Sequence, residues 1–303
     1  MQGQSLKALQ IIGVRYCESR RAEGNERPLD AYAVSGAYRQ AQVPFEIVEP
    51  AMPEGQRQEE ASDNLGLLGG AIAEAVAAAR RKGKVVLMTG GDCNHMTGLL
   101  GGLQSAHGPA ARIGLVWFDA HGDFNTPKTT LSGMLGGMPV AVAAGLAYPR
   151  WREWSRIVAP LPTDRILMVD VRNLDPAEEQ LIRATNVVVA APAPDFSGVD
   201  LEQAVNNLAR RCDMLYLHID SDILDETYVP NHRTKEPNGP DMAQVKTAVR
   251  TVMATGKVIA LAVVSVSGEG EGSEISIASG IELIQTGLEA WRQHGLPAVP
   301  TVG

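Results

Sequence analysis

Two short stretches of the chain carry acidic and histidine side chains at every second position. One stretch holds Asp119, His121 and Asp123, and the other holds Asp220 and Asp222. An extended chain points residues i, i+2 and i+4 to the same side, so each stretch can present its polar groups together. Four carboxylates in one crevice would repel one another, and two divalent cations would neutralise them. Carboxylate and imidazole ligands suit a hard or borderline ion such as Mn²⁺.

Two metal ions about 4 Å apart can share a water molecule, lower its pKa and direct it at an electrophilic carbon. Either motif alone is more often a surface turn than a metal site. Here each motif directly follows an apolar run, IGLVWF (113–118) or MLYLHI (214–219). The two motifs together therefore favour a dinuclear metal site that activates water.

These two apolar runs belong to a longer series, found at 9–14, 85–88, 113–118, 165–171, 186–191, 214–219 and 257–266. Continuous apolar runs are typical of strands buried on both faces of a parallel sheet. Helices are expected at about 62–82, 241–254 and 276–294, because each of these stretches ends near a glycine. The alternation predicts one doubly wound α/β domain over residues 1–303.

A third polar cluster, GGDCNH (90–95), follows the apolar run at 85–88. In open parallel sheets the ligand crevice lies at the carboxyl ends of the strands, so the three clusters can converge there. The segment 120–160 is rich in Gly, Pro and Thr and is too long for an ordinary connection. We therefore expect it to serve the active site.

Composition excludes several functional classes. The chain has 35 acidic and 27 basic residues, a net charge of −8, and no basic run that would indicate a nucleic-acid partner. Cys17, Cys93 and Cys212 are odd in number and widely spaced, which fits a reducing compartment without disulfides. The sequence shows neither a signal peptide nor a membrane span, so we expect a cytoplasmic protein that acts on a small molecule.

The three polar clusters occur in the order and spacing of a known family. They resemble the ureohydrolase (arginase and agmatinase) signatures Gly-Gly-Asp-His-Ser, Asp-Ala-His-x-Asp and Ser-x-Asp-x-Asp-x-x-Asp-Pro, and the resemblance covers roughly residues 60–290. Segments 125–133 and 230–239 resemble two substrate loops of that family. The resemblance implies a three-layer α/β/α fold with a mainly parallel sheet. It also implies two Mn²⁺ ions, hydrolysis of a guanidino or related C–N bond, and a homo-oligomer, commonly a trimer or hexamer.

Five metal ligands of the family match Asp119, His121, Asp123, Asp220 and Asp222, while the sixth, a histidine in the family, is replaced by Cys93. His95 cannot simply take its place, because a helix turns about 100° per residue and His95 would point about 200° away.

We interpret Cys93 as a metal ligand whose softer thiolate would shift the preference towards Zn²⁺ or Fe²⁺. The alternative is an inert buried side chain. A cysteine at this position also resembles the hydroxyarginine-hydrolysing branch of the family.

Other departures concern the substrate. Asn125 and Ser132 are retained from the loop that holds the amino-acid end in arginases, but Met134 and Gly136 replace an asparagine and a proton-transferring histidine. Ser265 stands where arginases carry the glutamate that receives the guanidinium. Loss of that charge-assisted partner removes about 1.5–3 kcal/mol of binding energy.

Two loops contain candidate groups to compensate for these losses. Glu269, Glu271 or Glu274 could replace the missing carboxylate, although a solvated turn is the favoured interpretation. His232 lies in the substrate loop 230–239, with Glu236 in register with the family, and could supply acid/base chemistry. The alternative for His232 is an ordinary surface residue.

The sequence thus predicts a hydrolase of a guanidino, hydroxyguanidino, amidine or ureido compound that does not use plain arginine. The retained ligands favour catalysis. The three substitutions at Met134, Gly136 and Ser265 favour either a new substrate or no activity. The alternative function is therefore a catalytically inactive, metal-binding homologue that acts as a scaffold or partner subunit.

Overall fold

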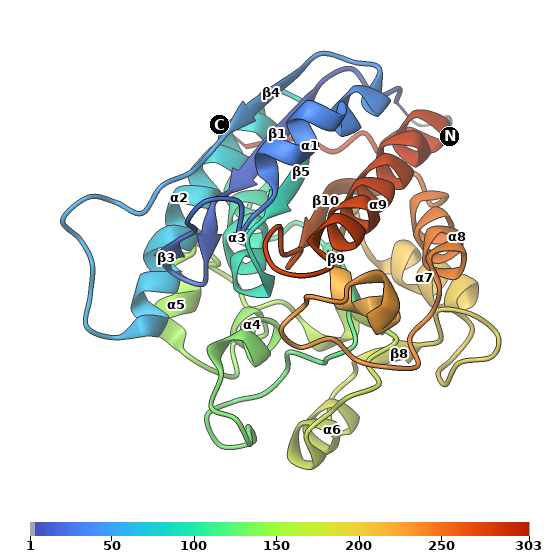
Figure 1. The fold of residues 1–303 in the computed structure, drawn as a ribbon. Helices are drawn as coiled ribbons and strands as arrows, with labels where there is room; N and C mark the ends of the chain where they lie inside the picture. Colours follow the sequence, from blue (N-terminus) through green and yellow to red (C-terminus); the bar gives the residue numbers. More distant parts are fainter. Residues whose placement is uncertain (1–3, 303) are drawn as a thin grey trace.

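The computed structural model describes residues 4–302 and is built around an eight-stranded parallel sheet (Figure 1). In spatial order the strands are β4 (Phe45–Val48), β1 (Leu9–Val14), β5 (Val85–Gly90), β10 (Val258–Val264), β9 (Met214–Asp220), β6 (Ile113–Phe118), β7 (Ile166–Val169) and β8 (Val188–Ala190). A separate antiparallel hairpin joins β2 (Tyr16–Cys17) to β3 (Arg20–Arg21).

All seven predicted strand segments contain a strand of this sheet. The inner strands β1, β5, β6, β9 and β10 are buried along their whole length, as continuous apolar runs require. The edge strand β4 was not predicted, because its residues are mostly exposed and form no apolar run.

Helices cover both faces of the sheet (Figure 1). One face packs against α1 (Leu29–Ser35), α7 (Leu201–Arg211), α8 (Met242–Met253) and α9 (Ser273–His294). The other packs against α2 (Ala61–Arg81), α3 (Met96–His107), α4 (Pro139–Ala143) and α5 (Pro149–Trp154), with Ile182 of α6 (Pro176–Arg183) joining the same core. This arrangement confirms the three-layer α/β/α prediction.

Glycines allow α2, α3 and the end of α5 to pack closely. A Cβ added at Gly98 would lie 2.6 Å from the backbone oxygen of Gly69, and one at Gly101 would lie 1.8 Å from that of Ser155. Such close packing fixes the position of α3 against the sheet. It therefore also fixes the turn that carries Cys93 into α3.

The four neighbouring strands β5, β10, β9 and β6 end side by side, and the three polar clusters follow three of them. The segment 120–160 divides into two parts. Its first part passes this edge of the sheet, but its second part forms α4 and α5 and is buried in the core with residues such as Val140 and Trp151. The expectation that the whole segment serves the site is therefore wrong for its second half. No helix within residues 4–302 has the length and apolar character needed to cross a bilayer.

Candidate metal centre

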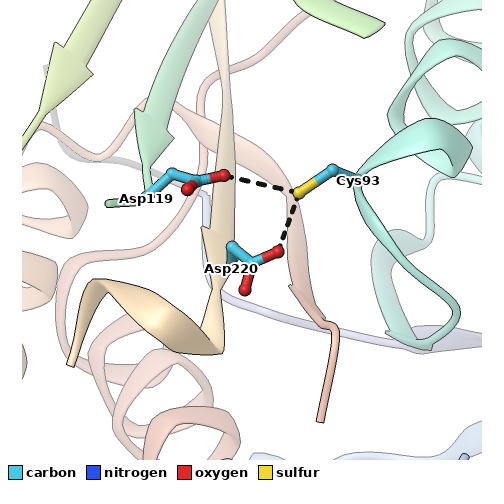
Figure 2. A group of neighbouring side chains, drawn as sticks. All are labelled: Cys93, Asp119 and Asp220. Atoms are coloured by element: carbon cyan, nitrogen blue, oxygen red, sulfur yellow. Dashed lines mark hydrogen bonds between the residues drawn. The ribbon is translucent and has the colours of Figure 1, made fainter. Parts of the chain in front are cut away.

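Cys93, Asp119 and Asp220 meet at the carboxyl ends of β5, β6 and β9 (Figure 2). Asp119 directly follows β6, Asp220 ends β9, and Cys93 opens the short 3-10 turn Cys93–His95 that leads into α3. The Cys93 Sγ atom lies 2.9 Å from Asp220 Oδ2 and 3.5 Å from Asp119 Oδ2. All three side chains are buried. The structure thus places Cys93 in direct contact with two predicted ligands.

His121 joins Asp119 to the second carboxylate motif. Its Nδ1 atom lies 3.3 Å from Asp119 Oδ1 and 3.2 Å from Asp222 Oδ2. Its Nε2 atom faces Glu236 Oε1 at 3.3 Å. In metal sites a histidine ligand usually donates its other ring nitrogen to a carboxylate or carbonyl, which is the arrangement that Glu236 offers to His121.

His232 approaches the same carboxylates from the loop after β9. Its Nε2 atom lies 3.3 Å from Asp220 Oδ1, and its Nδ1 atom lies 3.6 Å from Asp222 Oδ2. Thr234 donates its hydroxyl to Asp222 Oδ2 at 3.2 Å. The His232 side chain is only 8% exposed, so the structure excludes the alternative of an ordinary surface histidine.

The residues present fit a site for two cations. Three overlapping groups each bring their ligand atoms within 4.8 Å of one another: Cys93 with Asp119 and Asp220, Asp119 with His121 and Asp222, and Asp220 with Asp222 and His232. Because Asp119, Asp220 and Asp222 occur in two groups each, one carboxylate could serve two ions. The ligand types are those that Mn²⁺ accepts, with one softer sulfur.

The pKa shifts within the cluster favour bound positive charge, carried either by protons or by cations. Burial, together with neighbouring carboxylates, raises the pKa of Asp119 well above its usual range. Burial disfavours the charged form of His121, but hydrogen bonds to Asp119 and Asp222 outweigh it and raise its pKa to about 12. Burial and the carboxylates of Asp220 and Asp119 raise the pKa of the Cys93 thiol. Without metal, the cluster therefore holds protons that cations would displace.

Asp123 lies beside this cluster rather than within its closest groups. It is buried, and burial raises its pKa. Its backbone has a positive φ of 46°, an uncommon conformation for a residue other than glycine. Its backbone carbonyl accepts hydrogen bonds from Val140 and Ala141 of α4. The structure thus holds Asp123 in a strained, fixed conformation beside the carboxylate cluster.

The predicted substrate residues occupy different environments. Asn125 is buried and donates its amide to Asp175 Oδ2 at 3.2 Å, so it also fastens its own loop. Ser132 lies exposed further along the same loop. Ser265 directly follows β10, and its hydroxyl donates to Asp220 Oδ2. The residue that stands where the family signature places a guanidinium-binding carboxylate therefore contacts a predicted metal ligand here.

The residues considered as replacements for the missing glutamate and for the missing ligand histidine lie outside the close ligand groups. Glu269, Glu271 and Glu274 are all exposed, and Glu269 accepts a hydrogen bond from the backbone of Asn25 at 2.7 Å. This geometry agrees with a solvated turn. His95 is buried, and its ring nitrogens contact the backbone amide of Asp92 and the backbone oxygen of Glu18, both at 2.9 Å. His95 thus caps the turn at the start of α3.

Sequence reasoning did not identify His218, which lies on β9 under the site. Its Nε2 atom is 3.4 Å from Cys93 Sγ, and its Nδ1 atom is 2.6 Å from the Tyr216 hydroxyl. Burial lowers the pKa of His218 to about 3, so the imidazole is neutral. The available signal was a histidine at the signature position that is a serine in the family, inside a strand predicted to be fully buried.

The fold and site define a class: parallel α/β proteins whose central strands end at a buried, carboxylate-rich candidate metal site. Residues 38–288 match the arginase family, and the chain belongs to this family. Arginase-family members are metal-dependent hydrolases that act on C–N bonds, and they typically bind a dinuclear metal centre.

Individual relatives are distant. The chain is 30% identical to the arginase of Bacillus caldovelox over 162 residues, covering 52% of this chain and 53% of that protein. It is 28% identical to Neurospora crassa arginase over 233 residues, covering 72% of this chain and 64% of that protein. The matched region thus spans about half to two thirds of the length of these curated relatives.

Solved structures share the fold at low identity. Entamoeba histolytica arginase in complex with L-ornithine superimposes with a TM-score of 0.82 at 21% identity, covering 95% of this chain and 99% of that chain. Formimidoylglutamase from Bacillus subtilis superimposes with a TM-score of 0.69 at 15% identity, covering 98% and 90% of the two chains. Because the fold accommodates both enzymes, it does not by itself identify a substrate.

Proposed function

We propose that this chain is a dinuclear-metal hydrolase of a guanidino, hydroxyguanidino, amidine or ureido compound other than plain arginine. The observation that carries the proposal is the convergence of buried Cys93, Asp119 and Asp220 with His121 and Asp222 at the ends of adjacent strands. Such a cluster is unfavourable without cations, and family membership supplies the type of reaction.

The proposed ligands are Cys93, Asp119, His121, Asp123, Asp220 and Asp222, and the proposed ions are two Mn²⁺, or Zn²⁺ or Fe²⁺ if the Cys93 sulfur decides the preference. When bound, the ions would lower the pKa of a water molecule and neutralise developing negative charge. Asp123 is proposed to orient that nucleophile, because its backbone is fixed and its carboxyl group is buried at the crevice.

His232 is proposed to deliver the proton that the leaving amine needs. Its Nε2 atom lies 3.3 Å from Asp220 Oδ1, and its Nδ1 atom lies 3.6 Å from Asp222 Oδ2. Two nearby carboxylates favour the protonated imidazolium, which has a proton to give. This environment supports the acid role.

The substrate proposal rests on what replaces the arginine-specific groups. Asn125 and Ser132 are proposed to hold the amino-acid end of the substrate. The Ser265 hydroxyl donates a hydrogen bond to Asp220, and serine has no negative charge that could pair with a guanidinium. A less basic group, such as a hydroxyguanidine, depends less on that missing charge and on the histidine replaced by Gly136.

The test combines metal content with a substrate screen. Purified chain reconstituted with Mn²⁺ should bind two ions and release urea or ammonia from at least one compound of the proposed classes. L-arginine and agmatine should turn over much more slowly than ~10 per second, an ordinary enzyme rate. Fewer than one ion per chain, or arginine turnover at the ordinary rate, would contradict the proposal.

A second candidate is an inactive, metal-binding homologue that acts as a scaffold or partner subunit, which the substitutions at Met134, Gly136 and Ser265 favour. It predicts two bound ions and no product from any compound in the screen. In either case we propose a cytoplasmic homo-oligomer, a trimer or hexamer, whose mass light scattering would measure.

A further inference from the structure

Two residues that depart from the family signatures are in contact. Cys93 replaces the histidine that follows Gly-Gly-Asp, and His218 replaces the serine that opens Ser-x-Asp-x-Asp. These residues are 125 positions apart in the chain, yet Cys93 Sγ lies 3.4 Å from His218 Nε2. The ligand position thus lacks an imidazole, but an imidazole contacts the cysteine that stands there.

The environment of His218 fixes which ring nitrogen carries the hydrogen. The ring is fully buried and stacks on Trp117, with centroids 4.0 Å apart and planes 7° from parallel. Its Nδ1 atom is 2.6 Å from the Tyr216 hydroxyl, whose only hydrogen-bond contact within residues 4–302 is this one. A buried phenol is satisfied when it donates its hydrogen to an acceptor, and this ring nitrogen is the acceptor that the Tyr216 hydroxyl contacts. Nδ1 is therefore the acceptor, and the hydrogen of the imidazole lies on Nε2.

The Nε2–H of His218 consequently points at the Cys93 sulfur. The thiol hydrogen of Cys93 is directed elsewhere, to Asp220 Oδ2 at 2.9 Å. Metal binding requires the thiolate and releases that hydrogen as a proton. The donor from His218 then remains to stabilise the negative sulfur, and hydrogen bonds to a charged acceptor are the stronger kind.

We propose that His218, oriented by Tyr216, is a positioning residue that holds Cys93 as a thiolate ligand and thereby sets the ion preference of its metal position. The inference deepens the proposed function, on whose metal centre it rests. His218 Nε2 belongs to none of the close ligand groups found within residues 4–302, so it acts through the sulfur. Outer partners of this kind tune both the orientation and the electron donation of a ligand.

The experiment uses Co²⁺ as a probe, because a thiolate bound to Co²⁺ produces a sulfur-to-metal charge-transfer absorption. Two variants of similar size differ only in the donor: His218→Gln retains an N–H near the Nε2 position, and His218→Met does not. We expect the His218→Met variant to bind Co²⁺ and Zn²⁺ about 10–100-fold more weakly at one position and to shift the absorption band. The His218→Gln variant should stay close to the wild type.

A double-mutant cycle separates this role from packing. Cys93→His alone places a second imidazole against His218 and should weaken binding at this position. Cys93→His combined with His218→Ser restores the family pair and should recover affinity, now with Mn²⁺ preferred over Zn²⁺. Thermal unfolding of each metal-free variant controls for folding. If His218→Met does not fold, Tyr216→Phe removes the orienting hydroxyl and should change the band in the same direction.

Two outcomes would overturn the inference. Equal affinities and identical bands in the wild type and the His218→Met variant would make His218 a packing residue only. A wild-type protein that binds two Co²⁺ ions without a thiolate band would show that Cys93 is not a ligand. The second result would leave the hydrolase proposal standing on the remaining ligands, whereas failure to bind ions at all would count against both.

Discussion

At the scale of single residues, Ser265 stands where the family signature places a guanidinium-binding glutamate, and its contacts fix it beside Asp220. Its hydroxyl donates to Asp220, and its backbone N–H donates to the Gly91 carbonyl at 3.1 Å. These two hydrogen bonds fix the backbone at the point where β10 ends. Its φ is 62°, held by these contacts. The side chain at this position therefore lies beside Asp220 at the end of β10.

We predict that Ser265→Glu raises kcat/KM for L-arginine by about 10–100-fold, because a charge-assisted hydrogen bond to the guanidinium contributes about 1.5–3 kcal/mol. Steady-state urea release measures the effect. Ser267→Glu, which adds the same charge two residues further on, is the matched control and should change little. An equal gain in both variants would indicate a non-specific effect of charge, and no gain at Ser265 would show that arginine is excluded by other groups.

A proton-donating His232 predicts a defined pH dependence. Burial lowers the pKa of His232, but Asp222 and Asp220 outweigh it and raise the pKa above its usual value. This raised pKa is that of the metal-free chain. A general acid works only while protonated, so the activity of the metal-loaded enzyme should fall as pH rises through the pKa that His232 has beside the bound ions. His232→Asn should lower kcat by about 10²–10⁴-fold and remove that limb of the profile.

Metal content provides the control for the His232→Asn variant. It should remain at two ions per chain if His232 acts as an acid, and the exposed neighbour Arg233→Ala should retain both activity and the wild-type profile. Loss of one ion in the His232→Asn variant would identify His232 as a ligand instead.

At the scale of secondary-structure elements, Arg172 joins the site to the loop that covers it. Its guanidinium donates to the carbonyls of Asp222 and Glu236, at 3.1 and 3.0 Å, and also to those of Ile223 and Pro237. One side chain thereby ties the end of β9 to loop 230–239, which carries His232. The planar, five-donor geometry of arginine is required for this, and lysine cannot reproduce it.

We predict that Arg172→Lys lowers the free energy of unfolding by about 2–4 kcal/mol, because several carbonyls lose a charged donor. Urea unfolding measures this. Arg183→Lys, at an exposed helical ion pair with Glu179, should stay within about 0.5 kcal/mol of the wild type. Metal affinity should also fall in the Arg172→Lys variant, because His232 and Glu236 are no longer held. An unchanged midpoint would show that the loop is fixed by other contacts.

The same elements show what sequence patterns can reveal. The inner strands were predicted because each is a continuous apolar run, and the helices α2, α8 and α9 were predicted because each stretch ends near a glycine. The ligand-bearing residues were predicted because they follow those strands at fixed spacing. Arg172 and His218 were not, because their roles depend on contacts with residues 50 or more positions away. Only the packed structure brings such partners together.

At the scale of the whole molecule, the buried cluster couples metal binding to stability. Burial, then the carboxylates of Asp222 and Asp123, raise the pKa of Asp119 in the folded chain. A carboxyl group with a raised folded pKa contributes stability below its unfolded pKa and loses it as pH rises through the folded pKa. The metal-free protein should therefore lose stability as pH rises, and the metal-loaded protein should not.

We predict that Mn²⁺ raises the Tm relative to protein treated with a chelator, and that the difference grows with pH. An ion present at 100 times its Kd stabilises the folded state by about 2.7 kcal/mol per site. Unfolding entropy of about 2.1 cal/mol/K per residue gives about 0.6 kcal/mol/K for a chain of this length, so each site should add about 4 °C. Calorimetry at a series of pH values measures both effects.

Asp119→Asn should remove most of the metal response while making the metal-free protein less sensitive to pH, because the buried charge is gone. If Mn²⁺ and chelator gave the same Tm at every pH, the cluster would not be a metal site, and its carboxylates would have to be stabilised by protons alone.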